Sequence, residues 1–186
     1  ACACSFPSQM TVPLMKIPTR CLLVFVPALF TALPAPGQDF GPKQVITTLA
    51  QYAAAVYAAD LDNDGDLDAL SASPKDDKIA WYENVGLRNG VNGGIFGPQQ
   101  IITSQATSTR AVHAADLDGD GLKDVLFAAY GSDTIAWFRN LGDGSFGQEQ
   151  NLSSMADGAI DVHAADLDND GDLDVISASS LDGKIA

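Results

Sequence analysis

The chain has 186 residues, a length typical of one domain, and its 46% hydrophobic and 18% charged residues exclude a disordered acidic tail. Twenty-four acidic residues against ten basic ones give a net charge of −14, which disfavours a nucleic-acid partner because phosphates would be repelled. Only Glu83 and Glu149 are glutamates, so the acidity is almost purely aspartate. Aspartate with 17 glycines favours loops and metal chelation over helices.

The first 37 residues differ in composition from the rest. Lys16 and Arg20 precede an apolar run over residues 21–33, and Ala35 and Gly37 supply small residues at its exit. This pattern, over about residues 10–37, predicts a secretory signal peptide that is cleaved after Gly37. Thirteen apolar residues are too few to cross a bilayer, which takes about 20, so no membrane span is expected. We therefore expect a secreted, extracellular or cell-surface protein.

The three cysteines, Cys2, Cys4 and Cys21, all lie within this leader. The mature part, residues 38–186, would contain no disulfide. An exported domain of this size without disulfides is expected to depend on packing or on bound metal for its stability.

Residues 38–186 are internally repetitive. A Phe-Gly pair recurs at Phe40, Phe96 and Phe146, and an Ala-Ala-Asp sequence follows each pair at a matching distance. The repeats divide the chain into units 40–95, 96–145 and 146–186, of which the third is truncated.

Each unit is predicted to form four short strands because apolar runs alternate with Gly, Asp and Asn turns. In the second unit the expected strands are residues 100–103, 111–115, 124–130 and 134–139. Four antiparallel strands in about 50 residues are typical of one β-propeller blade, and four to eight blades close a ring. The predicted fold is all-β, with about three blades present, and we expect this chain to be a fragment of a larger propeller.

The segment D-x-D-x-D-G-x-x-D occurs three times. Carboxylates at positions 1, 3, 5 and 9 can converge on one point if the backbone curls, and glycine at position 6 permits that turn. Position 7 is Asp, Leu and Asp in the three copies, so ligation there is expected through the backbone carbonyl. All-oxygen ligation favours Ca²⁺ over softer metals and over Mg²⁺. The predicted ligands of the three sites are Asp60, Asp62, Asp64, Asp66 and Asp68; Asp116, Asp118, Asp120, Leu122 and Asp124; and Asp166, Asp168, Asp170, Asp172 and Asp174.

Two alternatives for these loops can be weighed from the sequence. An EF-hand requires Glu at position 12 and flanking helices, whereas position 12 is Ser71, Phe127 or Ser177 and the flanks are strand-like. Acidic turns without metal are disfavoured because four close carboxylates repel one another unless they are neutralised.

The Asp loops, together with the Phe-Gly pairs, resemble FG-GAP/VCBS repeats over about residues 40–186. That family builds the calcium-bearing β-propellers of integrin α subunits and of many secreted microbial proteins. The resemblance implies Ca²⁺ at Asp60, Asp62, Asp64 and Asp68 and at the two equivalent sets. The Gly-Ala-Pro half of the family pattern is absent, because Pro98 follows Phe96-Gly97, so the integrin-like ligand function is not carried over.

The remaining aromatic and histidine residues are expected to be structural. His113 and His163 occupy equivalent positions, and Tyr57 fills the third, so strand packing is favoured over catalysis or zinc binding. Trp81 and Trp137 are expected to pack between blades, although a sugar-stacking platform remains an alternative.

The sequence favours a secreted calcium-binding module for binding or adhesion, with an extracellular protein or glycan as partner. No catalytic residue is predicted, because catalysis needs a set of residues that breaks the repeat symmetry. A scaffold or accessory domain of a secreted polysaccharide-degrading enzyme is the alternative, and a structural spacer is a third possibility.

Overall fold

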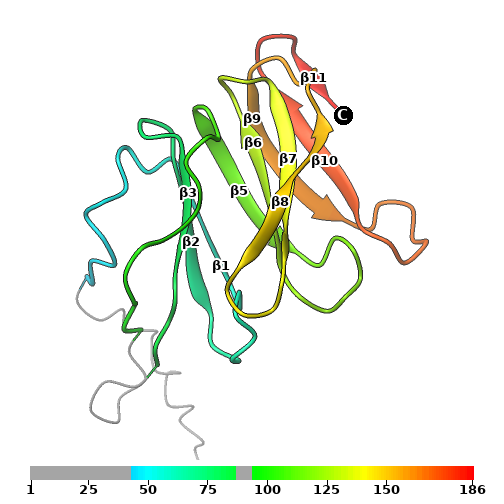
Figure 1. The fold of residues 1–186 in the computed structure, drawn as a ribbon. Helices are drawn as coiled ribbons and strands as arrows, with labels where there is room; N and C mark the ends of the chain where they lie inside the picture. Colours follow the sequence, from blue (N-terminus) through cyan, green and yellow to red (C-terminus); the bar gives the residue numbers. More distant parts are fainter. Residues whose placement is uncertain (1–42, 87–93) are drawn as a thin grey trace, which may run out of the picture. The chain divides into compact units, whose positions relative to one another are not determined.

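A computed structural model describes residues 43–86 and 94–186, and the predicted leader lies outside these ranges. The described residues form strands and no helix, which confirms the all-β prediction (Figure 1). None of them forms a helix long and apolar enough to cross a membrane. The strands are β1 (Ala55–Ala59), β2 (Asp68–Ser73), β3 (Lys78–Tyr82), β4 (Gln100–Thr103), β5 (Thr109–Ala115), β6 (Asp124–Ala129), β7 (Thr134–Asn140), β8 (Phe146–Ser153), β9 (Ala159–Ala165), β10 (Asp174–Ser179) and β11 (Lys184–Ile185).

These strands form three antiparallel sheets in chain order. The first sheet runs β1-β2-β3-β4, the second β5-β6-β7-β8, and the third comprises β9, β10 and β11. Four-stranded antiparallel sheets agree with propeller-like repeats, although the described residues do not form a closed propeller.

The sheets do not coincide with the sequence units, which corrects the predicted strand grouping. β4, expected to open the second blade, instead closes the first sheet by pairing with β3, with Ala80 opposite Ile101. β8 pairs with β7 in the same way, across the short turn of residues 141–145. The short link before β8 brings that strand beside β7, which favours antiparallel pairing. The link before β4 is longer, residues 83–99, and an antiparallel bridge between Asn84 and Phe96 continues the pairing of β3 with β4. The equivalent segment 44–47 is not a strand.

The core lies between successive sheets. Leu70 and Ile79 of the first sheet pack in one cluster with Val112 and Phe127 of the second. The opposite face of the second sheet packs against the third in another cluster, where Leu126 and Ile135 lie with Val162 and Ala164. Because side chains of a strand alternate between faces, the second sheet is covered on both sides.

Both tryptophans and His113 pack between the sheets, in agreement with the predicted packing role. Trp81 is buried in the first inter-sheet cluster, and Trp137 packs against the second. His113 is buried on β5, and its ring lies 4.6 Å from that of Tyr57 and 4.2 Å from that of His163. Equivalent positions of the three sheets thus form one row of rings in contact, edge-on between Tyr57 and His113 and tilted between His113 and His163.

Candidate metal centres

The first carboxylate of each Asp loop holds the turn together. Asp60, Asp116 and Asp166 accept hydrogen bonds from the backbone N–H of the glycine at position 6, at 3.0, 3.0 and 3.2 Å. These glycines have φ angles of 96°, 91° and 100°, a left-handed conformation that other residues adopt only with strain. The predicted role of glycine in the sharp turn is confirmed.

The position-9 carboxylate ties the loop to the sheet. Asp68 accepts the N–H of Leu61 and the N–H of Asn84, both at 2.8 Å. Asp124 likewise accepts the N–H of Leu117 at 2.9 Å and the N–H of Asn140 at 2.8 Å. Each of these two buried carboxylates therefore fixes the start of the loop and the end of the third strand of its sheet.

The third loop is attached more loosely. Asp174 accepts the N–H of Leu167 at 3.0 Å, and it is exposed, whereas Asp68 and Asp124 are buried. The third loop is therefore the most open of the three.

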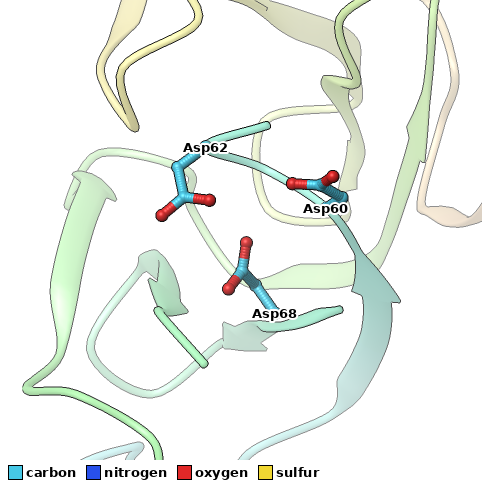
Figure 2. A group of neighbouring side chains, drawn as sticks. All are labelled: Asp60, Asp62 and Asp68. Atoms are coloured by element: carbon cyan, nitrogen blue, oxygen red, sulfur yellow. The ribbon is translucent and has the colours of Figure 1, made fainter. Parts of the chain in front are cut away.

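Three carboxylates converge in each loop. Ligand atoms from positions 1, 3 and 9 lie within 4.8 Å of one another in all three copies. Figure 2 shows Asp60, Asp62 and Asp68 of the first loop turned toward one another. The converging residues of the other loops are Asp116, Asp118 and Asp124, and Asp166, Asp168 and Asp174. These acidic clusters could hold a metal ion.

Burial and mutual repulsion make the charged form of these carboxyls costly without a cation. Burial raises the pKa values of Asp68 and Asp124. Burial, together with the charges of Asp64 and Asp60, also raises the pKa of Asp62. In the second loop, Asp116 Oδ1 is buried without a hydrogen-bond partner among the described residues. A divalent cation would relieve each of these costs.

The predicted ligands at positions 5 and 7 lie outside the converging sets. Asp64 and Asp170 accept hydrogen bonds from the N–H at position 7, at 2.9 and 3.0 Å, and so close the turn. Asp120 does the same for Leu122 and also pairs with Arg139. Ligation by position 5 and by the position-7 carbonyls stays a prediction.

An arginine distinguishes the second loop. Arg139 Nε lies 2.8 Å from Asp118, and Arg139 Nη2 lies 2.9 Å from Asp120. This guanidinium lowers the pKa of Asp120, and the two carboxylates raise the pKa of Arg139. The Arg139 guanidinium therefore places a positive charge beside the carboxylates at positions 3 and 5 of the second loop.

Comparison with known families agrees with this geometry. A family model described as an FG-GAP-like repeat matches residues 60–127 and again residues 116–177, which together cover more than half of the chain. The chain belongs to the FG-GAP-like repeat family. Both matches begin at the first aspartate of an Asp loop, so the loops and the strands that follow them carry the family pattern.

Comparisons with curated proteins and with solved structures do not extend this family assignment. No curated protein matches this FG-GAP-like chain. A solved structure of an Agrocybe aegerita lectin, described by its recognition of non-reducing terminal N-acetylglucosamine, is 23% identical with a TM-score of 0.47. The alignment covers 66% of this chain and 32% of the lectin chain, so this chain spans about a third of that protein's length.

Sequence reasoning missed two features of these FG-GAP-like repeats. Asn84 and Asn140 each follow the position-9 aspartate by 16 residues, and this recurring spacing could have identified them as part of the site. Arg139 occupies the position equivalent to Glu83 of the first unit. This reversal of charge between equivalent positions could have indicated that the second loop has a different charge environment.

Proposed function

We propose that the three Asp loops bind Ca²⁺. The observation that carries the proposal is the convergence of three carboxylates in each loop. Carboxylate oxygens are hard ligands of the kind that Ca²⁺ takes, and they can bind in flexible arrangements. The raised pKa values of Asp68 and Asp124 support the proposal, because buried negative charge favours a cation.

The residues that would hold the ion are the carboxylates at positions 1, 3 and 9, joined by position 5 and the position-7 carbonyl. A bound calcium ion would supply positive charge that neutralises these groups. These carboxylates would connect the ion to the fold. The position-1 carboxylate accepts the glycine N–H that closes the turn, and the position-9 carboxylate accepts an N–H at the end of the adjoining strand. The metal site would therefore stabilise the junction between loop and sheet.

The expected gain in stability is substantial. At millimolar Ca²⁺ and a dissociation constant of about 10⁻⁴ M, each site adds about 1.4 kcal/mol to the free energy of unfolding. Three such sites together would add about 4 kcal/mol, a large share of a typical domain stability of about 5–15 kcal/mol.

Calorimetric titration of Ca²⁺ into the full chain, after bound metal has been removed with a chelator, tests the proposal. We expect three equivalents of Ca²⁺ and a matching rise in melting temperature, with Mg²⁺ far less effective. The Asp62→Ala variant should bind two equivalents, since each of the other two loops keeps its own three converging carboxylates. Absence of both binding heat and a thermal shift on chelation would overturn the calcium proposal.

We further propose that the chain acts outside the cell as a binding or adhesion module whose partner is a protein or a glycan. The predicted leader and the cysteine-free repeats support an exported protein. The threefold recurrence of the candidate ligands supports binding rather than catalysis, which needs one unique set of residues.

Two measurements test this role. Exported material should begin near Gln38 on N-terminal sequencing, and an uncleaved leader in a cytosolic pool would contradict export. The labelled chain should bind defined members of a glycan or extracellular-protein array in Ca²⁺, with the signal lost in chelator. No binding to either class in Ca²⁺ would argue against the partner assignment without affecting the calcium sites.

A further inference from the structure

One asparagine on β8 begins a sequence that can accept a covalent modification. Asn151-Leu152-Ser153 has the N-x-S/T pattern of N-glycosylation acceptors, in which x is any residue except proline. Asn151 is the only asparagine of the sequence that has Ser or Thr two positions later. Such a sequence carries a glycan at the surface of exported proteins, so its place in the fold decides whether it can be used.

Asn151 departs from the repeat pattern. The equivalent residues are Val45 and Ile101, within Gln-Val-Ile-Thr and Gln-Ile-Ile-Thr, whereas the third copy reads Gln-Asn-Leu-Ser. The hydroxyl that ends each segment has a structural role of its own, because Thr103 and Ser153 each accept the backbone N–H two residues later, at 3.2 Å. The change from an apolar residue to asparagine therefore completes the acceptor sequence in the third copy alone.

The fold uses the side chains or the backbone preferences of the other described asparagines. Asn84 and Asn140 donate their amide hydrogens to backbone carbonyls. Asn63 and Asn169 have φ angles of 64° and 62° inside Asp loops, a left-handed conformation in which asparagine is enriched. The side chain of Asn151 is exposed and makes no hydrogen bond to any described residue. Its amide therefore has no structural role within this part of the chain.

Asn151 lies on the outermost strand of its sheet. The strand order is β5-β6-β7-β8, so β8 pairs with β7 alone among the described strands (Figure 1). Asn151 lies opposite Ala136 and Ser153 lies opposite Ile135, which leaves Leu152 unpaired in a β-bulge. Residues 148–152 are all exposed. The amide nitrogen of Asn151 can therefore be reached from solvent, and a large group attached there would meet no neighbouring strand of the sheet.

We propose that Asn151 carries an N-linked glycan in the exported protein, an inference that rests on the proposed export. The amide nitrogen of Asn151 would form a bond to the anomeric carbon of a lipid diphosphate-linked oligosaccharide, and the bond from that carbon to the diphosphate oxygen would break. The lipid diphosphate leaves with the bonding electron pair, and the amide loses one proton. Nothing is oxidised or reduced in this transfer.

A glycan at this position would protect an exposed sheet edge. Edge strands present unpaired backbone groups that can pair with another chain, and proteins obstruct such edges with charged or bulky features. Leu152, beside the acceptor asparagine, is 49% exposed. A bulky hydrophilic glycan on Asn151 would hinder the approach of another strand to β8 and would increase solubility.

Secretion of the full chain by a cultured animal cell line tests the proposal. We expect the exported wild-type chain to exceed its polypeptide mass by one glycan, and peptide-N-glycosidase to remove this excess and leave aspartate at position 151. Asn151→Gln should lose the whole excess. Ser153→Thr should keep it, because threonine retains the acceptor pattern and the hydroxyl that accepts the Met155 N–H.

Ile101→Asn is the matched gain-of-site variant. It creates Asn-Ile-Thr at the equivalent place on β4, where residue 101 lies opposite Ala80, next to a register shift of the same kind, and is 54% exposed. Since the two positions share their strand geometry, the secreted variant should carry two glycans. A variant that gains a glycan at residue 101 while Asn151 stays unmodified would overturn the proposal.

Peptide mass mapping of exported and retained chain gives the decisive result. Asn151 left unmodified in both pools would overturn the glycan site. The same material separates this failure from failure of the proposed function, because leader cleavage and Ca²⁺ binding are measured on it directly. A chain that begins near Gln38 and binds Ca²⁺ without a glycan would overturn this inference alone, whereas an unglycosylated chain with an uncleaved leader would overturn export as well.

Discussion

The side-chain amide of Asn140 donates a hydrogen bond of 2.8 Å to the backbone carbonyl of Leu61, 79 positions earlier in the chain. The same amide donates to the carbonyl of Lys123 at 2.9 Å, and the Asn140 N–H donates to Asp124 at 2.8 Å. One buried residue thus connects the second Asp loop, the end of β7 and the first Asp loop. The loops are part of the sheet junctions rather than independent turns.

Replacing Asn140 with alanine should destabilise the fold by about 1–3 kcal/mol, because it leaves the buried carbonyl of Leu61 without a donor. Asn84→Ala is the matched control. The Asn84 amide donates to Leu67 within its own sheet, at 3.1 Å and in an exposed setting. Urea unfolding of the full chain measures both changes, and equal losses would contradict the inter-sheet role of Asn140.

The β7–β8 turn depends on a glycine beside a tryptophan. Gly144 has a φ of 74°, and a Cβ there would lie 2.6 Å from Cζ2 of Trp81. Gly144→Ala should cost about 1–3 kcal/mol, since it combines left-handed strain with overpacking. Gly183, at a φ of 66° with open space around its Cβ position, is the control for strain alone. Melting temperatures should fall further for Gly144→Ala, and equal shifts would show that Trp81 gives way.

The strand content and the three loops could be predicted because they depend on local patterns. Apolar runs separated by Gly, Asp and Asn turns predicted the strands, and the glycine at position 6 of each loop predicted the sharp turn. The sheet membership of β4 could not be obtained in this way. Its sequence lies next to the second unit, yet backbone pairing places it on β3, and repeat boundaries in a sequence carry no information about pairing.

The ligand geometry was predicted only in part, for a related reason. The motif presents positions 1, 3, 5 and 9 as equivalent carboxylates, yet positions 1, 3 and 9 converge. In the second loop, position 5 is held by Arg139, a residue 19 positions further along the chain. In all three loops position 5 accepts the backbone N–H of position 7, and the nine-residue motif alone does not show which carboxylates close the turn in this way.

Arg139 should weaken cation binding at the second loop. Its guanidinium already compensates Asp118 and Asp120, so Arg139→Gln should raise the Ca²⁺ affinity of that loop by about two- to fivefold, the range for one exposed ion pair. The control is Glu83→Gln, the equivalent position of the first unit, which removes a negative charge and should lower affinity or leave it unchanged. Calorimetric titration compares the two variants, and a fall in affinity for Arg139→Gln would contradict the competition.

His113 should make folding sensitive to mild acid. Burial, followed by the charge of nearby His163, lowers the pKa of His113 below its ordinary value of 6.5, against an opposing effect of Asp161. The unfolded chain therefore takes up the proton first as pH falls. The stability from neutral His113 is complete above pH 6.5 and is lost as pH decreases toward the folded-state pKa. The loss is about 1.4 kcal/mol for each pH unit that separates the two pKa values.

Melting temperatures at pH 7.5 and 5.5, in saturating Ca²⁺ and in chelator, measure this sensitivity. His113→Tyr is the informative variant, because Tyr57 occupies the same position in the first sheet and does not titrate in this range. We expect a smaller fall in melting temperature for His113→Tyr than for wild type under both conditions. His163→Gln should give an intermediate fall, since it removes one cause of the lowered pKa and leaves His113 buried. An identical fall in all three proteins would assign the acid sensitivity to the carboxylates of the Asp loops instead.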